Sequence, residues 1–148
     1  MIQATNDFIK YFGSIRRRTL NYIRVIPPNQ LNWSPKEGEF TCADIIWHII
    51  EAEKMFVRVA TEGLWKYEEH DSGDEQSLEA LIAQLEATHI EAMDKLERFP
   101  DQDLNEPRYG PKGEGRPVKA WRWLMAMSEH EIHHRSQLAV YLSLMGVQ

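Results

Sequence analysis

The sequence predicts an all-α protein, a four-helix bundle with long connections between its helices. Apolar residues recur at about 3.6-residue spacing in four separate stretches, the periodicity of a helix with one buried face. Segments rich in Pro, Gly and charge separate these stretches, and no stretch alternates with period two for long enough to predict a strand. The length of 148 residues suits one bundle, so residues 1–148 are expected to form a single domain.

The first helix is predicted over residues 8–26, where the chain carries a continuous apolar stripe. Pro27 and Pro28 end it, because proline lacks the amide hydrogen that the helical ladder needs. The basic run at 16–18 is expected to lie on the solvated face of this helix. The stripe consists of Phe8, Phe12, Ile15, Thr19, Tyr22, Ile23 and Ile26.

A loop at 29–40, which contains Pro and Gly, leads to a second predicted helix that begins at Thr41 and ends near Gly63. The Thr41 hydroxyl is suited to cap the free amides of the first turn. Asp44 lies favourably near the positive end of the helix dipole. These signals indicate a well-defined helix start.

The third helix is predicted from near Ser77 to just before Pro100, and the fourth from Pro117 to about Met145. Between them lies a connection, 101–116, which is rich in Gly, Pro and charge and long for a bundle. Loops of this kind often carry function. The stripe of the third helix consists of Leu78, Leu81, Ile82, Leu85, Ala92, Met93 and Leu96.

Composition narrows the class of protein. Hydrophobic residues make up 43% and charged residues 27%, the balance of a soluble globular chain. The N-terminal residues lack the pattern of a signal peptide, and no stretch approaches the eighteen or so apolar residues of a membrane span, so we expect a cytoplasmic protein with no membrane partner. The net charge of −6 argues against a nucleic-acid partner, because such affinity comes mostly from clustered Lys and Arg.

Cys42 is the single cysteine, which excludes an intramolecular disulfide and a multi-cysteine zinc site. It lies at the capped start of a helix, where burial is the more frequent role than nucleophilic chemistry. Soft metal ligation must therefore rely on histidine.

Three histidines point toward the predicted core. On the fourth helix, His130 and His134 lie about 40° apart in the middle of the apolar stripe, while His133 and Glu131 fall at its edges. On the second helix, His48 lies in the middle of the apolar face. Two separate helices therefore direct imidazoles toward one interior.

Such a group of imidazoles predicts a metal site. Buried ring nitrogens need partners, and an i, i+4 pair brings two of them close enough to share one ion. A third from a facing helix would complete a set that leaves coordination positions open, as in catalytic metal sites. Imidazole ligands suit Zn, Ni, Cu or Fe(II), and the spacing alone does not choose among these metals.

Two other kinds of metal site match this sequence less well. His130, Glu131 and His134 match HExxH, but the segment after His134 contains no residue suited to be the third ligand of a zinc protease. A di-iron site would draw on ExxH pairs and a carboxylate from each other helix, yet the first predicted helix has no Asp or Glu. The residues for that site would be Glu51, Glu86, His89, Glu131 and His134. His89 stays open as a reserve ligand or a core residue.

The segments EFTCADIIWHIIEAE and SEHEIHHRSQLAVYLSLMG, with LNWSPKEGEFT and PRYGPKGEGRPV, resemble the DinB-like (DinB/YfiT) family over nearly the whole chain. The resemblance implies a four-helix bundle with an up-down-down-up course. It also implies a divalent metal, Ni or Zn, on His48, His130 and His134, and an assembly that is often a homodimer. Ser136 stands where many relatives have Gly in HRGQ, which removes no ligand.

Some family members are thiol S-transferases that use bacillithiol or mycothiol. The resemblance therefore implies a metal-dependent S-transferase that activates a bacillithiol-like thiol for attack on an electrophile. Two alternatives stay open. One is a metal-dependent small-molecule hydrolase in which Glu131 is a candidate general base, and the other is a non-catalytic metal-binding stress protein.

Four further residues are candidates for contacts with a substrate. Trp33, Tyr109 and Trp121 are candidates for lining a pocket, although packing is the more frequent role of each. Arg135 is expected to meet a helix-end carboxylate rather than an acidic substrate group.

Overall fold

The structure, a computed structural model, describes residues 1–68 and 76–147. It contains four long helices, as predicted, and each lies within a few residues of its predicted bounds. These helices are α1 (Thr5–Arg24), α2 (Cys42–Glu62), α3 (Leu78–Glu97) and α4 (Ala120–Leu144). The prediction of an all-α bundle is confirmed.

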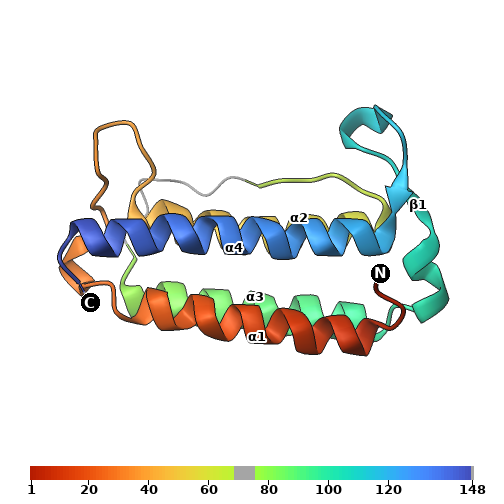
Figure 1. Cartoon of the computed structure of the whole chain (residues 1–148), viewed down its shortest axis with the longest axis horizontal. Helices are drawn as coiled ribbons and strands as arrows, with labels where there is room; N and C mark the ends of the chain where they lie inside the picture. Colours follow the sequence, from red (N-terminus) through yellow and green to blue (C-terminus); the bar gives the residue numbers. More distant parts are fainter. Residues whose placement is uncertain (69–75, 148) are drawn as a thin grey trace.

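Helices α1 and α4 run in one direction along the bundle, and α2 and α3 run in the other (Figure 1). Each of α1 and α4 therefore has parallel and antiparallel neighbours. Helix α2 packs against α3 and α4, and α1 packs against the same two helices from the other side. This is the up-down-down-up course that the family resemblance implies.

The ends of α2 follow from local chemistry. The Thr41 hydroxyl accepts a hydrogen bond from the Asp44 amide at 3.1 Å, and the Asp44 carboxylate accepts one from the Thr41 amide at 2.9 Å. This reciprocal capping box satisfies two amides at the start of the helix. At the other end Gly63 adopts φ 72°, the left-handed conformation that glycine tolerates and that ends helices. These caps hold the helix that carries His48 in place.

The long connection between α3 and α4 contains two features that periodicity did not predict. Short 3₁₀ turns, η2 (Asp101–Asn105) and η3 (Pro111–Gly113), lie in it. Strands β1 (Pro107–Arg108) and β2 (Val118–Lys119) pair antiparallel across it. The expectation of no strand was wrong here, because two residues are too few for an alternating pattern to register.

Two apolar clusters fill the two halves of the bundle. On α1 one cluster includes Phe8, Phe12 and Ile15 and the other includes Leu20 and Ile23, and the other helices divide in the same way. Between the clusters lies a layer of buried polar side chains. The charged members of this layer are Arg16, Glu53 and Glu131, and the half-buried His89 joins them.

Arg16 corrects one prediction. The basic run at 16–18 was expected to be solvated, but only Arg17 and Arg18 are exposed, whereas Arg16 is 3% exposed and points into the bundle.

In the part of the chain that the structure describes, no helix combines the length and apolar character needed to cross a bilayer.

Candidate metal centre

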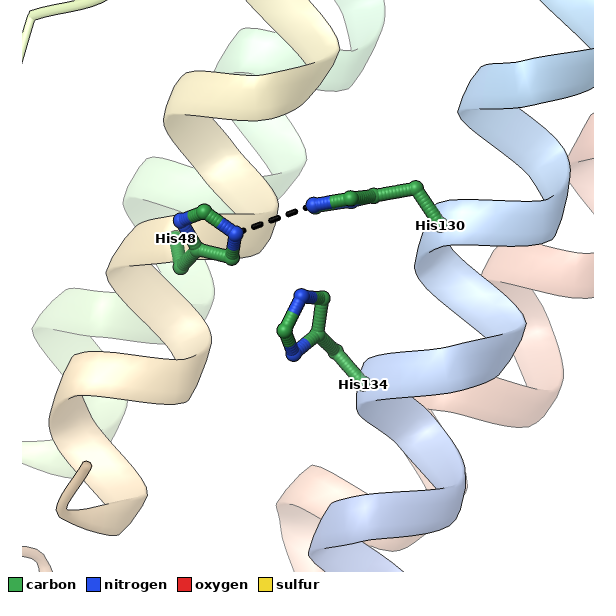
Figure 2. A group of neighbouring side chains, drawn as sticks. All are labelled: His48, His130 and His134. Atoms are coloured by element: carbon green, nitrogen blue, oxygen red, sulfur yellow. Dashed lines mark hydrogen bonds between the residues drawn. The ribbon is translucent and has the colours of Figure 1, made fainter. Parts of the chain in front are cut away.

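The three predicted histidines converge between α2 and α4 (Figure 2). Nε2 of His130 lies 2.9 Å from Nε2 of His48. The ring centre of His134 lies 4.5 Å from that of His48 and 4.4 Å from that of His130. One nitrogen from each ring lies within 4.8 Å of the others, so the three lone pairs are placed to share one ion.

The other ring nitrogen of His48 has its own partner. Nδ1 of His48 lies 2.7 Å from the Tyr67 hydroxyl, on the segment that follows α2. When Nδ1–H donates to that hydroxyl, Nε2 carries the lone pair and faces His130. At this distance the lone pairs of the two facing Nε2 atoms would repel each other unless a proton or a cation lies between them. A metal ion therefore suits this pair of atoms.

The ring of His134 is oriented in the same manner. Its Nδ1 lies 3.0 Å from Oε1 of Gln137, one turn along α4. An amide oxygen only accepts, so Nδ1 carries the hydrogen and Nε2 carries the lone pair. His134 thus presents a nitrogen of the kind that binds metals.

The electrostatics of the cluster favour neutral rings. Burial, followed by the neighbouring imidazoles of His134, His48 and His133, lowers the pKa of His130 to about 3. Burial also lowers the pKa of His134. Neutral imidazole is the form that ligates metals, so at neutral pH these rings do not have to lose a proton to bind an ion.

Aromatic side chains surround the cluster. The ring centre of Phe56 lies 5.7 Å from His130, and that of Phe40 lies 5.5 Å from His48. Phe56 lies on the same helical face as His48 and was detectable from its spacing. Phe40 and Tyr67 lie outside the helices, where no period identifies a partner, so the sequence reasoning missed them.

The candidate pocket residues contact other parts of the protein, and none of their described contacts is with the three histidines. Trp33 packs edge-on against Tyr141 with ring centres 5.4 Å apart, and Trp121 packs against the apolar cluster at the α1 N-terminal end. Tyr109 is exposed in the connection before α4. Arg135 donates to the main-chain oxygen of Ile15 at 3.4 Å rather than to the expected carboxylate.

Glu131, the candidate base, is held by Arg16 in the polar layer. Nε and Nη2 of Arg16 donate to its two oxygens at 2.9 and 2.8 Å, and the Glu131 side chain is 3% exposed. Glu53 accepts from Arg16 and lies 2.8 Å from Nδ1 of His89. The first helix thus supplies a buried cation where a di-iron site needs a carboxylate, and His89 binds Glu53 rather than joining the metal ligands.

Two further residues have defined places. His133 is exposed beside His134, with ring centres 4.9 Å apart, and lies outside the group of converging nitrogens. Cys42 is fully buried, as expected, and burial raises the pKa of its thiol to about 11. Among the described residues, His48, His130 and His134 form the one group with the convergence that a metal ion requires, and no carboxylate belongs to it.

The chain is similar to known proteins both in sequence and in fold. The chain is 25% identical over 142 residues to YjoA of Bacillus subtilis, an alignment covering 96% of this chain and 91% of that protein. A DinB-like protein from Bacillus cereus ATCC 10987 superposes with a TM-score of 0.83 at 21% identity, covering 100% of this chain and 97% of that one.

Two more solved structures share the fold. YfiT of Bacillus subtilis, described as a probable metal-dependent hydrolase with an unusual four-helix bundle topology, superposes with a TM-score of 0.74 at 17% identity and covers 97% of this chain and 89% of its own. The colibactin self-resistance protein ClbS, solved with double-stranded DNA, superposes with a TM-score of 0.67 at 13% identity over 97% of both chains. A model of the DinB superfamily matches residues 11–138, and the chain belongs to that superfamily.

Proposed function

We propose that this protein is a divalent-metal-dependent thiol S-transferase. His48, His130 and His134 hold the ion, Ni²⁺ or Zn²⁺, through one nitrogen each. A divalent ion held there with open positions would lower the pKa of a thiol bound beside it, so that the thiolate would be available at neutral pH. The sulfur forms a bond to an electrophilic carbon, the leaving group departs with its electron pair, and the thiol proton passes to solvent.

The convergence of three imidazole nitrogens among the described residues, a donor set that would leave positions open on an ion, is the observation that supports this proposal. Bulk water has a pKa of about 15.7, so a metal must lower it much further than the pKa of a thiol to give an anion at neutral pH. A thiol has a pKa of about 8.5, so the metal alone is sufficient to deprotonate it. Both carboxylate oxygens of Glu131, the candidate base, accept hydrogen bonds from Arg16 in a buried ion pair. Thiol activation therefore fits this set of residues better than water activation.

The residues around the ligands have positioning roles in this mechanism. Tyr67 holds the ring of His48, and Gln137 holds the ring of His134. The buried Phe56 packs beside His130 and places apolar surface against that ring, whereas Phe40, which contacts His48, is exposed. A bacillithiol-like thiol of the cytoplasm, where we expect the protein to act, is the cosubstrate that this chemistry requires.

Metal stoichiometry tests the first part of the proposal. Elemental analysis of untagged protein is expected to give about one ion per chain, and His48→Ala is expected to lose it at unchanged circular dichroism. His133→Ala is the matched control, because His133 lies beside the cluster but outside it. A chain that holds no metal even after reconstitution would return the histidines to a packing role.

A thiol screen tests the second part. Metal-loaded protein is expected to accelerate the reaction of monobromobimane or chlorodinitrobenzene with a low-molecular-weight thiol, and His134→Ala is expected to abolish the acceleration. His133→Ala is expected to retain it. Equal rates with and without protein, across several thiols and both electrophiles, would contradict the assignment as a transferase.

A metal-dependent hydrolase is the second candidate, because YfiT, which has a similar fold, is described as a probable metal-dependent hydrolase. Turnover of ester or amide substrates without added thiol would favour it over the transferase. A protein that binds metal but turns over neither class would be a non-catalytic metal-binding protein.

Small molecules and a second copy of this chain are the partners that we propose. The net charge of −6 supports a small thiol and an electrophile over nucleic acid, which stays a prediction. Exposed apolar side chains near the C-terminal ends of α1 and α4 support a homodimer. These side chains are Tyr22, Val25, Val140 and Leu144. Sedimentation of the purified chain is expected to give twice the monomer mass.

A further inference from the structure

A chain of hydrogen bonds runs from His134 away from the metal ligands. Nδ1 of His134 donates to Oε1 of Gln137 at 3.0 Å, and Nε2 of Gln137 donates to the Tyr141 hydroxyl at 3.4 Å. That hydroxyl donates to the main-chain oxygen of Phe40 at 2.8 Å. The side chains lie three and four residues apart on α4, a spacing that aligns them along one face of the helix.

The direction of this chain is determined at its far end. A main-chain carbonyl only accepts, so the Tyr141 hydroxyl must give its single hydrogen to Phe40. Toward Gln137 the hydroxyl is then left with a lone pair, which faces the amide nitrogen of that side chain. The amide oxygen of Gln137 is thereby turned toward His134.

We propose that Gln137 and Tyr141 are positioning residues that select the tautomer of His134 in which Nε2 carries the lone pair. The Phe40 carbonyl is the anchor of this relay. Phe40 immediately precedes Thr41, the cap of the helix that carries His48, so the anchor is attached to the other ligand helix. The relay thus connects the orientation of a ligand on α4 to the start of α2. This inference rests on the proposed metal site.

The energetic effect follows from the competing tautomer. If the Gln137 amide reverses, its NH₂ group faces Nδ1 of His134 and favours the form with hydrogen on Nε2, which cannot bind a metal. The apparent metal affinity falls by the fraction of chains in the competent form. Loss of a partner beyond the ligands commonly costs about 10- to 100-fold in metal affinity.

A cycle of four proteins tests the relay. Tyr141→Phe removes the hydroxyl that links Gln137 to the anchor and is expected to weaken Zn²⁺ binding about tenfold in competition with a chromogenic chelator. Gln137→Glu replaces the amide by a carboxylate whose two oxygens both accept, so its orientation no longer matters. In the Gln137→Glu background, Tyr141→Phe is therefore expected to change the Zn²⁺ affinity less than twofold.

The cycle separates positioning from packing. If Tyr141 only fills space, Tyr141→Phe costs the same in both backgrounds, and that result would overturn the proposal. Tyr11→Phe, at an exposed tyrosine of α1, is the matched control and is expected to leave Zn²⁺ affinity unchanged.

A second readout does not require the metal. In long-range ¹H–¹⁵N spectra of the metal-free protein, His134 is expected to show hydrogen on Nδ1, and Tyr141→Phe is expected to shift it toward the Nε2–H form. An unchanged tautomer in that variant contradicts the relay even if metal binds. A shifted tautomer in a chain that binds no metal supports the relay and contradicts the proposed function alone.

Discussion

Each of the three proposed ligand histidines has two ring nitrogens with separate roles. One nitrogen of each ring faces the shared point between α2 and α4, and for His48 and His134 the other nitrogen has a defined partner in Tyr67 and Gln137. Partners of this kind fix the tautomer and the direction of the lone pair. The histidine positions alone therefore do not make the site, because ring orientation comes from residues beyond the ligands.

Cys42 carries a prediction at the same scale. Its thiol is fully buried, and burial raises its pKa to about 11, so at pH 8 only about one thiol in a thousand is thiolate. We expect native protein to react with Ellman's reagent far more slowly than urea-unfolded protein, with reactivity rising only as the pH approaches 11. Fast labelling of the native chain at pH 8 would show that Cys42 is accessible.

This result has a bearing on the mechanism. A silent Cys42 means that thiol consumed in the proposed reaction comes from the added cosubstrate and not from the protein. Cys42→Ser is accordingly expected to retain thiol-dependent turnover.

At the scale of the helices, each one contributes a side chain to the buried polar layer. Arg16 of α1 binds Glu131 of α4 and Glu53 of α2, and Glu53 also contacts His89 of α3. Glu131 directly follows His130, so the layer bonds to the same turn of α4 that carries a proposed metal ligand. The helices that form the site are thus joined to the two that do not.

The layer predicts a large effect of one substitution. Arg16→Met keeps an unbranched side chain but leaves Glu53 and Glu131 buried without their cation, so we expect the free energy of unfolding to fall by about 3–5 kcal/mol. Arg17→Met, at the exposed neighbour, is expected to change it by about 0.5 kcal/mol or less. Urea unfolding followed by circular dichroism measures both.

A second substitution checks the cause. Adding Glu131→Gln to Arg16→Met removes one uncompensated charge and is expected to recover part of the loss. Equal stabilities for the Arg16 and Arg17 variants would show that the buried ion pairs contribute nothing to stability.

At the scale of the whole molecule, the candidate site joins two helices, α2 and α4, that are not consecutive in the sequence. His48 lies on α2, whereas His130 and His134 lie on α4, and α2 and α4 run in opposite directions (Figure 1). An ion shared by these residues exists only when the bundle is assembled. Metal binding must therefore favour the folded state.

Thermal unfolding measures this linkage. At a free Zn²⁺ concentration about 100 times the Kd, binding stabilises the folded state by about 2.7 kcal/mol, which corresponds to a rise in Tm of about 5–10 °C for a chain of this size. His134→Ala is expected to lose the rise and His133→Ala to keep it. A rise of the same size in both variants would place the metal elsewhere.

The amino-acid sequence was sufficient for the features that one helix decides by itself. Apolar spacing and caps located the four helices to within a few residues, and the same spacing put His48, His130 and His134 on interior faces. Periodicity carries this information because a helix has a fixed angle per residue, so the direction of each side chain relative to its own apolar stripe follows from its number.

Only the tertiary structure decided which side chains meet. The burial of Arg16, the pairing of Glu131 with it and the contact of Tyr67 with His48 each join residues from different segments. No spacing within one segment encodes such contacts, because they depend on how the helices are aligned lengthwise and on where the connections cross them. The sequence thus determined which histidines face the interior, and packing determined the partners that orient them and the buried cation, Arg16, that pairs with Glu131.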